Sequence, residues 1–143
     1  MYYRTIVLIL LSNDSKIYLV MFMIKKIVIA GCRDYTNYSQ AKEYIDKCLS
    51  NIRNENEIII MSGGAKGADA LGEQYAKENG FKIERYNADW DKYGRSAGPK
   101  RNEQMAKNCD CVICFWDGQS HGTKSMINYA KKYNKPIRII KIP

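Results

Sequence analysis

An apolar run that leads into a glycine-rich turn and then into a helical pattern constrains the fold of this chain more than any other stretch. Residues 58–61 (IIIM) are β-branched or long apolar side chains, and residues 62–67 (SGGAKG) follow directly. The next segment places Ala68, Leu71 and Tyr75 on one helical face. The stretch therefore predicts a buried strand, a tight turn and the opening of a helix.

Glycine at this junction has two interpretations. Glycine lets the backbone approach a bound group closely, and free N–H groups at a helix N-terminus attract anions. The first hypothesis is therefore a phosphate cradle at Gly63, Gly64, Lys66 and Gly67. The alternative is a strand-to-helix turn that needs glycine only for its own conformation. The spacing matches neither the Walker pattern nor the dinucleotide fingerprint, so the motif alone leaves both interpretations open.

The same strand-to-helix alternation recurs from residue 24 to the end of the chain. Apolar runs predict strands at residues 26–30, 57–61, 82–86, 111–116 and 137–142. Periodic segments predict helices at residues 39–52 and 67–79, from Pro99 onward, and up to about Tyr133. This alternation predicts an α/β fold with a doubly wound, mostly parallel, Rossmann-like sheet of about five strands and helices on both faces.

The first 22 residues do not follow this alternation. Two apolar, β-rich runs flank the polar residues 13–16, which predicts an extra strand or a hairpin. The favoured interpretation is that translation starts at Met21 or Met23 and that residues 1–22 are a start-site artefact, with the hairpin as the form expected if the segment is ordered. Neither run reaches the roughly 20 apolar residues that a membrane span needs. We therefore expect an extension at residues 1–22, a nucleotide-binding domain at residues 23–143, and no membrane association.

Charge and cysteine content narrow the class of partner and the compartment. The 143 residues carry a net charge of +8, which favours anionic partners such as nucleotides or nucleic acid. Five cysteines without a regular framework are typical of a reducing, cytoplasmic environment. Cys109, Cys111 and Cys114 lack the further ligands of a metal site, so we expect core thiols, no metal and no cofactor.

Four unusual segments fall at strand ends or at the start of the following helix, where the topology brings ligand sites together. They are residues 31–35, 62–69, 94–102 and 117–123. The candidate ligand- and phosphate-binding residues within them are Gly31, Arg33, Asp34, Ser62, Gly63, Gly64, Lys66, Gly67, Asp69, Arg95, Lys100, Arg101, Asn102, Gly118, Ser120, Gly122 and Thr123.

Two groups of cations in this set are expected to bind a phosphate. Arg33 is placed to pair with a phosphate in a bidentate way, and the alternative is a structural ion pair with Asp34 or Asp69. Lys100 and Arg101 follow Pro99 at a helix start, where side chains and backbone N–H groups grip the same anion. Trp90, Tyr93 and Trp116 could stack a base, or they could be ordinary packing.

Residues 118–122 (GQSHG) match the G-x-S-x-G pattern of hydrolases between a strand and a helix. His121 lies inside the motif and is the single histidine of the chain, so a Ser–His–Asp triad is rejected. We expect Ser120 and Thr123 to cap the helix and to donate to a phosphate, with His121 in solvent or at the rim.

Taken together, residues 31–35 (GCRDY), 62–69 (SGGAKGAD), 98–102 (GPKRN) and 118–123 (GQSHGT) resemble the YspA-type, cpYpsA-related branch of the SLOG superfamily. This Rossmann-like group includes the LOG proteins and the DNA-processing protein DprA. The resemblance implies a nucleotide or nucleotide-derived ligand, held by the glycine turns at the carboxyl edge of the sheet. It also leaves a homo-oligomer open, since LOG-like proteins commonly form one.

One departure from the resembled family bears on activity. LOG enzymes carry P-G-G-x-G-T-x-x-E with a catalytic glutamate, and Met126 stands at that position here. We therefore predict a protein that binds a nucleotide, nucleotide-sugar or ADP-ribose-type signal as a sensor or sequestering protein, rather than an enzyme. The alternative is a hydrolase of an N-glycosidic or phosphoester bond, with Asp34, Asp69 or Asp117 as its carboxylate. A second, less favoured alternative is binding of single-stranded nucleic acid.

Overall fold

The structure, a computed structural model, describes residues 6–13, 16–54 and 56–143, with side chains from residue 23 onward. In chain order the elements are β1 (Ile6–Asn13), β2 (Lys16–Gly31), α1 (Tyr38–Leu49), β3 (Asn56–Ser62), α2 (Ala68–Asn79), β4 (Lys82–Arg85), α3 (Trp90–Tyr93), the 3-10 turn η1 (Gly94–Ser96), α4 (Ala97–Asn108), β5 (Cys111–Trp116), α5 (His121–Lys132) and β6 (Ile137–Lys141).

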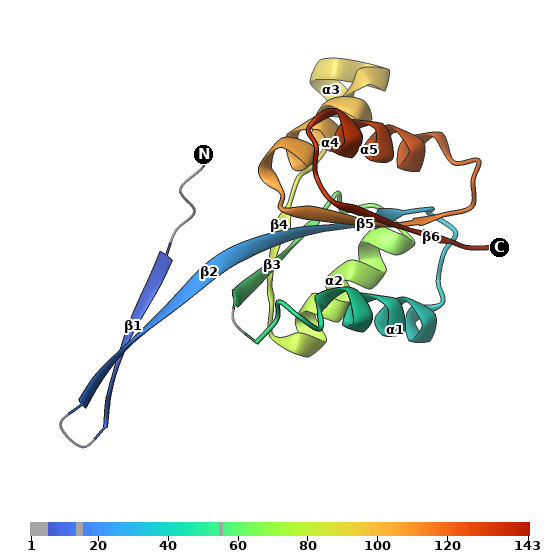
Figure 1. Ribbon diagram of the computed structural model, residues 1–143. Coiled ribbons are helices and arrows are strands. Elements are labelled where there is room, and N and C mark those ends of the chain that lie inside the picture. The colour runs from blue at the N-terminus through green and yellow to red at the C-terminus, as the bar shows by residue number, and fades with distance from the viewer. Residues whose placement is uncertain (1–5, 14–15, 55) are drawn as a thin grey trace.

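The sheet has the strand order β4-β3-β2-β5-β6, and all four of these pairings are parallel. The chain moves outward from β2 to β4 and then crosses back to β5 on the other side of β2. The order therefore reverses between β2 and β5, and this is the switch point of a doubly wound sheet. Helices α1 and α2 cover one face and α4 and α5 cover the other (Figure 1). The predicted doubly wound α/β fold is confirmed.

Alternate side chains of the central strand enter two separate cores. Ile27 and Ile29 pack toward α1 and α2, whereas Val28 and Ala30 pack toward α4 and α5. All four are at least nine-tenths buried. A strand buried on both faces needs apolar residues at successive positions, which is why residues 27–30 form an uninterrupted apolar run rather than an alternating one.

The cysteines follow the same alternation in β5. Cys111 packs against the core under α1 and α2, while Cys114 and the buried Cys109 belong to the core under α4 and α5. Cys111 and Cys114 thus lie on opposite faces, as predicted. Cys32, Cys48 and Cys114 are free thiols. Among the described residues, no group of three or more His, Cys, Asp or Glu side chains could hold a metal ion.

Strands β1 and β2 form an antiparallel hairpin, with Ile6 opposite Met23 and Asn13 opposite Lys16. Strand β3 pairs with β2 only from Met23 onward, and β5 only from Ile27 onward. The hairpin therefore projects from the body of the sheet (Figure 1). The predicted hairpin form is found in residues 6–13 and 16–22, while residues 1–5 and 14–15 of the extension lie outside the described part.

The structure corrects three predicted boundaries. Helix α4 begins at Ala97 rather than Pro99, because a proline within the first turn costs no hydrogen bond. Helix α1 ends at Leu49, and residues up to 54 form turns. The strand predicted at residues 82–86 ends at Arg85, and α3 and η1 lie between it and α4. Gly80 caps the C-terminus of α2 with a left-handed backbone, at φ of 69°. No described helix has both the length and the hydropathy of a membrane span.

Candidate functional site

A pocket of about 290 Å³ lies at the carboxyl ends of β2 and β5, at the switch point of the sheet. It brings together parts of all four segments that the sequence singled out. Its walls come from the end of β2, the turn before α2, the second turn of α4 and the start of α5. The lining residues are Ala30, Gly31, Cys32, Arg33, Asp34, Ala65, Asp69, Arg101, Asn102, Met105, Asp117, Ser120, Gly122, Thr123 and Met126.

Two glycines allow the walls of this pocket to meet. A Cβ on Gly31 would lie 2.3 Å from the carbonyl oxygen of Phe115 on β5. A Cβ on Gly67, where φ is +73°, would lie 2.3 Å from the carbonyl oxygen of Cys32. That same oxygen accepts a hydrogen bond from the backbone N–H of Ala68, at 3.1 Å. Gly67 therefore allows close packing of α2 against the end of β2.

The glycine turn after β3 is fixed by a buried polar network. The Ser62 hydroxyl lies 2.8 Å from Glu73 Oε1 and accepts a hydrogen bond from the N–H of Gly64 at 3.0 Å. Glu73 also accepts two hydrogen bonds from the guanidinium of Arg85, at 2.8 and 2.5 Å. Arg85 holds the pKa of Glu73 below its usual value. The network connects the turn to α2 and β4, so the Ser62 hydroxyl makes its hydrogen bonds within the protein and does not face the pocket.

The N-terminus of α5 faces the pocket without a side-chain cap. Ser120 occupies the N-cap position but makes no hydrogen bond to the helix backbone, and its Oγ lies 3.2 Å from Thr123 Oγ1. The prediction that Ser120 caps the helix is therefore wrong, because the two hydroxyls contact each other instead. A helix leaves its first N–H groups without intrahelical partners, and these groups attract anions.

The turn that leads into α5 is held by Asp117. Its Oδ1 accepts hydrogen bonds from the backbone N–H groups of Gln119 and Ser120, both at 2.8 Å. These bonds hold the pKa of the Asp117 carboxyl below its usual value. A carboxylate already occupied in this way is a poor general acid, so Asp117 shapes the pocket wall.

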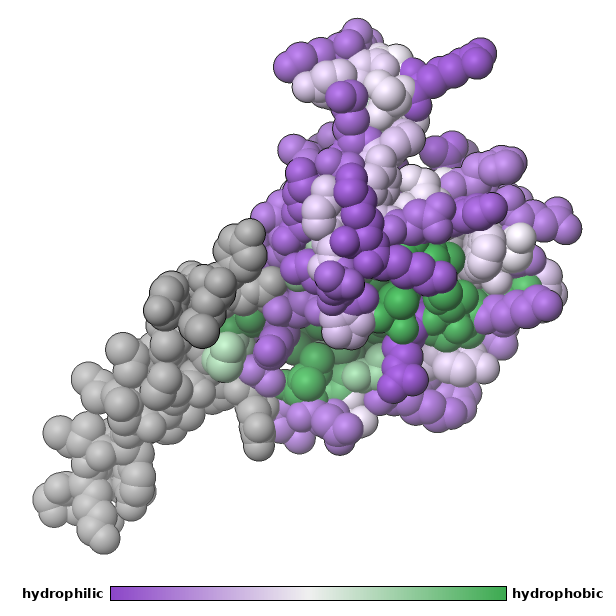
Figure 2. All heavy atoms as spheres, turned by 45° about the horizontal axis from the view of Figure 1, so that its top comes forward, coloured by the Kyte–Doolittle hydropathy of each residue, from purple (hydrophilic) through white to green (hydrophobic). Residues whose placement is uncertain are grey.

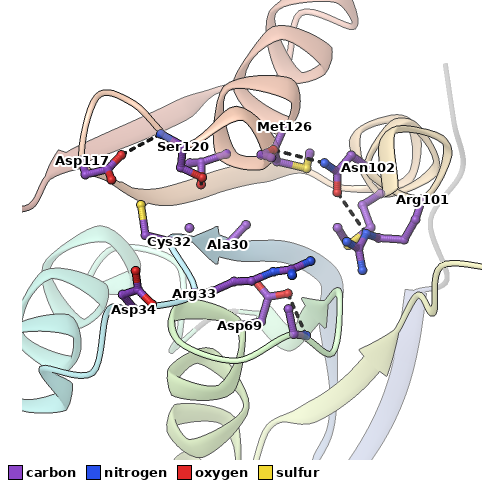
Figure 3. A pocket seen from close by; sticks show the side chains of 15 residues that line it. Ala30, Cys32, Arg33, Asp34, Asp69, Arg101, Asn102, Asp117, Ser120 and Met126 are labelled. Atoms are coloured by element: carbon purple, nitrogen blue, oxygen red, sulfur yellow. Dashed lines mark hydrogen bonds between the residues drawn. The ribbon is translucent and has the colours of Figure 1, made fainter. Parts of the chain in front are cut away.

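Two arginines from opposite walls converge on the pocket. Arg33 is exposed and extends across the pocket above Asp69 (Figure 3). Arg101 is half-buried; its Nη1 donates to the carbonyl of Gly63 at 2.6 Å and its Nε donates to Asn102 Oδ1 at 3.0 Å. Burial, and then the neighbouring charge of Arg33, lower the pKa of Arg101. Two like charges held close together favour an anion between them.

Asp69 lies in the first turn of α2 and is the most deeply buried carboxylate of the pocket, with 7% of its surface exposed. Its Oδ2 accepts one hydrogen bond, from the N–H of Ala65 at 3.1 Å. Burial raises the pKa of Asp69 above its usual value, against the opposing effects of Ala65 and Arg101. In the part of the chain that the structure describes, Arg33 forms no ion pair within 4.0 Å with Asp34 or Asp69, so that alternative role for Arg33 is not seen.

Several predicted site residues lie outside this pocket. Gly63, Gly64 and Lys66 line an adjoining outer hollow of about 550 Å³, together with Asn87 and Trp90. Lys100 points away and lies with its Nζ 4.6 Å from the centre of the Tyr93 ring. Arg95 and Gly118 are exposed and line none of the hollows described here.

Other lining residues were not among the predicted site residues. Cys32 lies inside the motif at residues 31–35 and Met105 follows the motif at residues 98–102, while Asn87 enters the outer hollow through the fold of the 87–89 segment. Met126, at the position of the LOG glutamate, is fully buried and lines the inner pocket. The pocket wall at that position is therefore apolar.

Comparison with known proteins confirms the resemblance drawn from the motifs. Residues 25–93 match the family model described as the YspA, cpYpsA-related SLOG family. The chain is also similar to the Gene 61 protein of Mycobacterium phage D29, with 28% identity over 119 residues. That alignment covers 79% of this chain and 94% of the phage protein.

Two solved structures of DNA processing protein A share the fold. The protein from Streptococcus pneumoniae aligns with a TM-score of 0.64 and 21% identity, covering 84% of this chain and 51% of that one. The protein from Helicobacter pylori, described as having a unique single-stranded DNA binding mode, aligns with a TM-score of 0.59 and 24% identity. The latter alignment covers 83% of this chain and 66% of that one. This chain thus spans about half of the Streptococcus protein.

Proposed function

We propose, from the SLOG-family match of residues 25–93 and the geometry of the switch-point pocket, that this protein binds a small nucleotide-derived ligand. One observation carries the proposal. Arg33 and Arg101 converge on a pocket that also faces the uncapped N-terminus of α5. Positive groups that lack an ion-pair partner within 4.0 Å among the described residues suit a phosphate, which would bind between the guanidinium groups and the helix.

The outer hollow offers room for the rest of a nucleotide. It shares Arg33, Asp34, Ala65 and Arg101 with the inner pocket, so the two spaces adjoin. Trp90, with 52% of its surface exposed, lines the outer hollow. An exposed indole is suited to stack a base. The ligand would therefore place its phosphate against α5 and its base beside Trp90.

The proposal is binding without cleavage, as a sensor or a sequestering protein. In the LOG pattern a glutamate supplies acid–base chemistry, and the apolar side chain of Met126 takes its place in this pocket wall. A hydrolase would instead have to use Asp34 or Asp69, which both line the pocket. Chromatography of the bound ligand after release by heat separates the two cases. Intact ligand supports binding alone, and free base or an opened phosphoester shows turnover.

The binding claim is tested by calorimetry with ADP, ADP-ribose, NAD and cyclic nucleotides. Replacing Arg33 by Gln removes one guanidinium, and among the residues that the structure describes the Arg33 side chain makes no hydrogen bond that this change would break. Loss of a charge-assisted bond of this kind should weaken binding about 10- to 100-fold. Arg95→Gln is the matched control, because Arg95 is an exposed arginine outside the hollows and should leave affinity unchanged. Equal affinity in the Arg33 variant and the wild type would contradict the proposal that Arg33 binds the phosphate.

A second candidate function, binding of single-stranded nucleic acid, is favoured by the charge of one face. Helices α4 and α5 carry six lysines and arginines and one glutamate, whereas α1 and α2 carry three lysines and five acidic residues. Figure 2 shows hydrophilic residues over most of one face, with hydrophobic residues gathered in a band between them. The positive helices lie on a single side of the sheet, where they could follow a phosphate backbone.

Aromatic rings on this face are paired with lysines. The Nζ atoms of Lys100 and Lys107 lie 4.6 and 5.4 Å from the ring centres of Tyr93 and Tyr133, respectively. A hollow of about 550 Å³ between α3, α4 and α5 includes Tyr93 and Tyr129. Rings and cations side by side are typical of surfaces on which single-stranded bases stack.

Titration with a fluorescent oligo-dT at several salt concentrations tests this second candidate. The double variant Lys100→Gln, Lys107→Gln should weaken binding and flatten its salt dependence, because two phosphate contacts are lost. Lys42→Gln, Lys47→Gln on α1 removes the same charge from the opposite face and is the control. No measurable binding by the wild type at low salt would rule the candidate out.

A further inference from the structure

We infer that Asp69 accepts a hydrogen bond from a ribose hydroxyl of the ligand, so that the pocket selects ribonucleotides over deoxyribonucleotides. The inference rests on the proposed function and adds the sugar to it. Its basis is a carboxylate more than nine-tenths buried that lines the pocket and has an oxygen left over.

The two oxygens of Asp69 have different surroundings. Oδ2 lies close to Gly63 and accepts the N–H of Ala65 at 3.1 Å. Within the described residues, no donor forms a hydrogen bond with Oδ1. A buried carboxylate with a single hydrogen bond is costly, and the cost falls when a further donor arrives. The site is therefore incomplete without a ligand that donates.

The charges around Asp69 limit the kind of ligand group that can lie beside its free oxygen. A phosphate would be repelled by the carboxylate, and it is already accommodated on the opposite wall by α5 and the arginines. A metal ion would need further ligands, and the described residues provide no such cluster. A hydroxyl is neutral and can donate a hydrogen bond, so it fits a pocket-lining carboxylate that accepts only the Ala65 N–H from the described residues.

The arrangement of the two hollows places the sugar at Asp69. The inner pocket has the α5 N-terminus on one wall and Asp69 on the other, as Figure 3 shows for Ser120 and Asp69. Trp90 and Asn87 line the outer hollow and not the inner pocket. A ligand with its phosphate at α5 and its base beside Trp90 therefore brings the group between them, the ribose, into the reach of Asp69.

The experiment compares ADP, 2′-deoxy-ADP, 3′-deoxy-ADP and inorganic diphosphate by calorimetry, on the wild type and on Asp69→Asn. Asparagine keeps an acceptor for the Ala65 N–H but loses the charge. We expect removal of the contacting hydroxyl, 2′ or 3′, to weaken binding to the wild type about tenfold or more. In Asp69→Asn that preference should shrink toward equal affinity, while diphosphate binds at least as tightly as to the wild type.

The control is Asp91→Asn, which removes an exposed carboxylate on α3 and should keep the full ribose preference. Equal binding of ADP and both deoxy analogues to the wild type overturns the inference and leaves the nucleotide proposal standing. A ribose preference that persists in Asp69→Asn also overturns it, because another group then reads the hydroxyl. Failure of ADP and diphosphate alike to bind overturns the proposed function together with the inference.

Discussion

At the scale of single residues, Asp69 is held where its charge is disfavoured. Burial raises its pKa in the folded protein, so the ionised form costs free energy of folding above the pKa of the unfolded state. Asp69→Asn should therefore raise the free energy of unfolding by about 1 kcal/mol at pH 7 while it weakens ligand binding.

Urea unfolding of both proteins between pH 7 and pH 4 checks this trade-off. The difference should diminish as pH falls, because Asp69 becomes protonated in the wild type and the cost of its charge disappears. A variant that is less stable than the wild type at pH 7 would show that the carboxylate is satisfied within the protein.

Gly67 and Gly80 both have a positive φ, 73° and 69°, but they differ in ψ, which is −126° at Gly67 and 23° at Gly80. A Cβ on Gly67 would meet two backbone carbonyl oxygens at 2.3 and 2.4 Å, whereas a Cβ on Gly80 meets nothing within 4 Å. Alanine at Gly80 should cost about 1 kcal/mol for conformation alone. Alanine at Gly67 should cost about 3 kcal/mol, because backbone atoms cannot move aside.

Thermal unfolding of the two glycine variants measures the difference. A similar loss for both would mean that the close approach of α2 to the end of β2 contributes nothing beyond the backbone angle. A larger loss at Gly67 supports the interpretation that this glycine serves packing.

At the scale of elements, the contact between α2 and β4 depends on Glu73 and Arg85. Glu73→Ala leaves the buried Ser62 and the guanidinium of Arg85 without their acceptor, which should cost about 2 kcal/mol after allowance for the exposure of Arg85. The Glu73 pKa is lowered by Arg85, so this contribution is present above the unfolded pKa of a glutamate and is lost as pH falls through the folded value.

Denaturant unfolding as a function of pH tests the Glu73 contribution. Glu43→Ala is the control, because Glu43 pairs with Lys47 while both side chains are about two-thirds exposed, and its loss should cost less than about 0.5 kcal/mol. If the Glu73 variant loses no more stability than the control, the network has no structural role.

The elements show why sequence predicts some features and not others. Residues 111–116 form β5 at the predicted bounds because an apolar run between polar turns is stable as a strand that is buried on both faces of the sheet. The sequence predicts the start of α4 at Pro99, two residues too late, since proline is tolerated at several positions of a first turn. The Ser62–Glu73–Arg85 network joins residues up to 23 positions apart, and no local pattern indicates such pairings.

The candidate site divides in the same way. The rim at the switch point follows from topology, so Arg33, Asp69, Arg101 and Ser120 were predicted to lie together. The roles of Gly63 and Gly67 depend on atoms from other segments, and sequence could not show that their Cα atoms face protein. Helix α5 lacks a side-chain cap because the Ser120 hydroxyl contacts Thr123, and the sequence does not determine which rotamer Ser120 adopts.

At the scale of the whole molecule, the parallel pairings of the sheet begin at Met23, and the described core residues all lie from Ile27 onward. Residues 16–22 of β2 pair with β1 alone, and both pairings of β2 in the main sheet begin at Met23 or later. A variant that begins at Met23 should therefore keep its melting temperature within about 3 °C and bind ADP with unchanged affinity. Differential scanning calorimetry and a repeat titration check this, and a large loss of stability would show that the hairpin supports the fold.

The central claim is that the switch-point pocket binds phosphate between two arginines and the start of α5. A crystal structure of the protein with ADP-ribose tests it most directly. We expect phosphate oxygens within hydrogen-bond distance of Arg33, Arg101 and the N–H groups of Gly122 and Thr123, with the ribose beside Asp69. Ligand density on the α4 and α5 face, or an empty pocket at saturating ADP-ribose, would contradict the account.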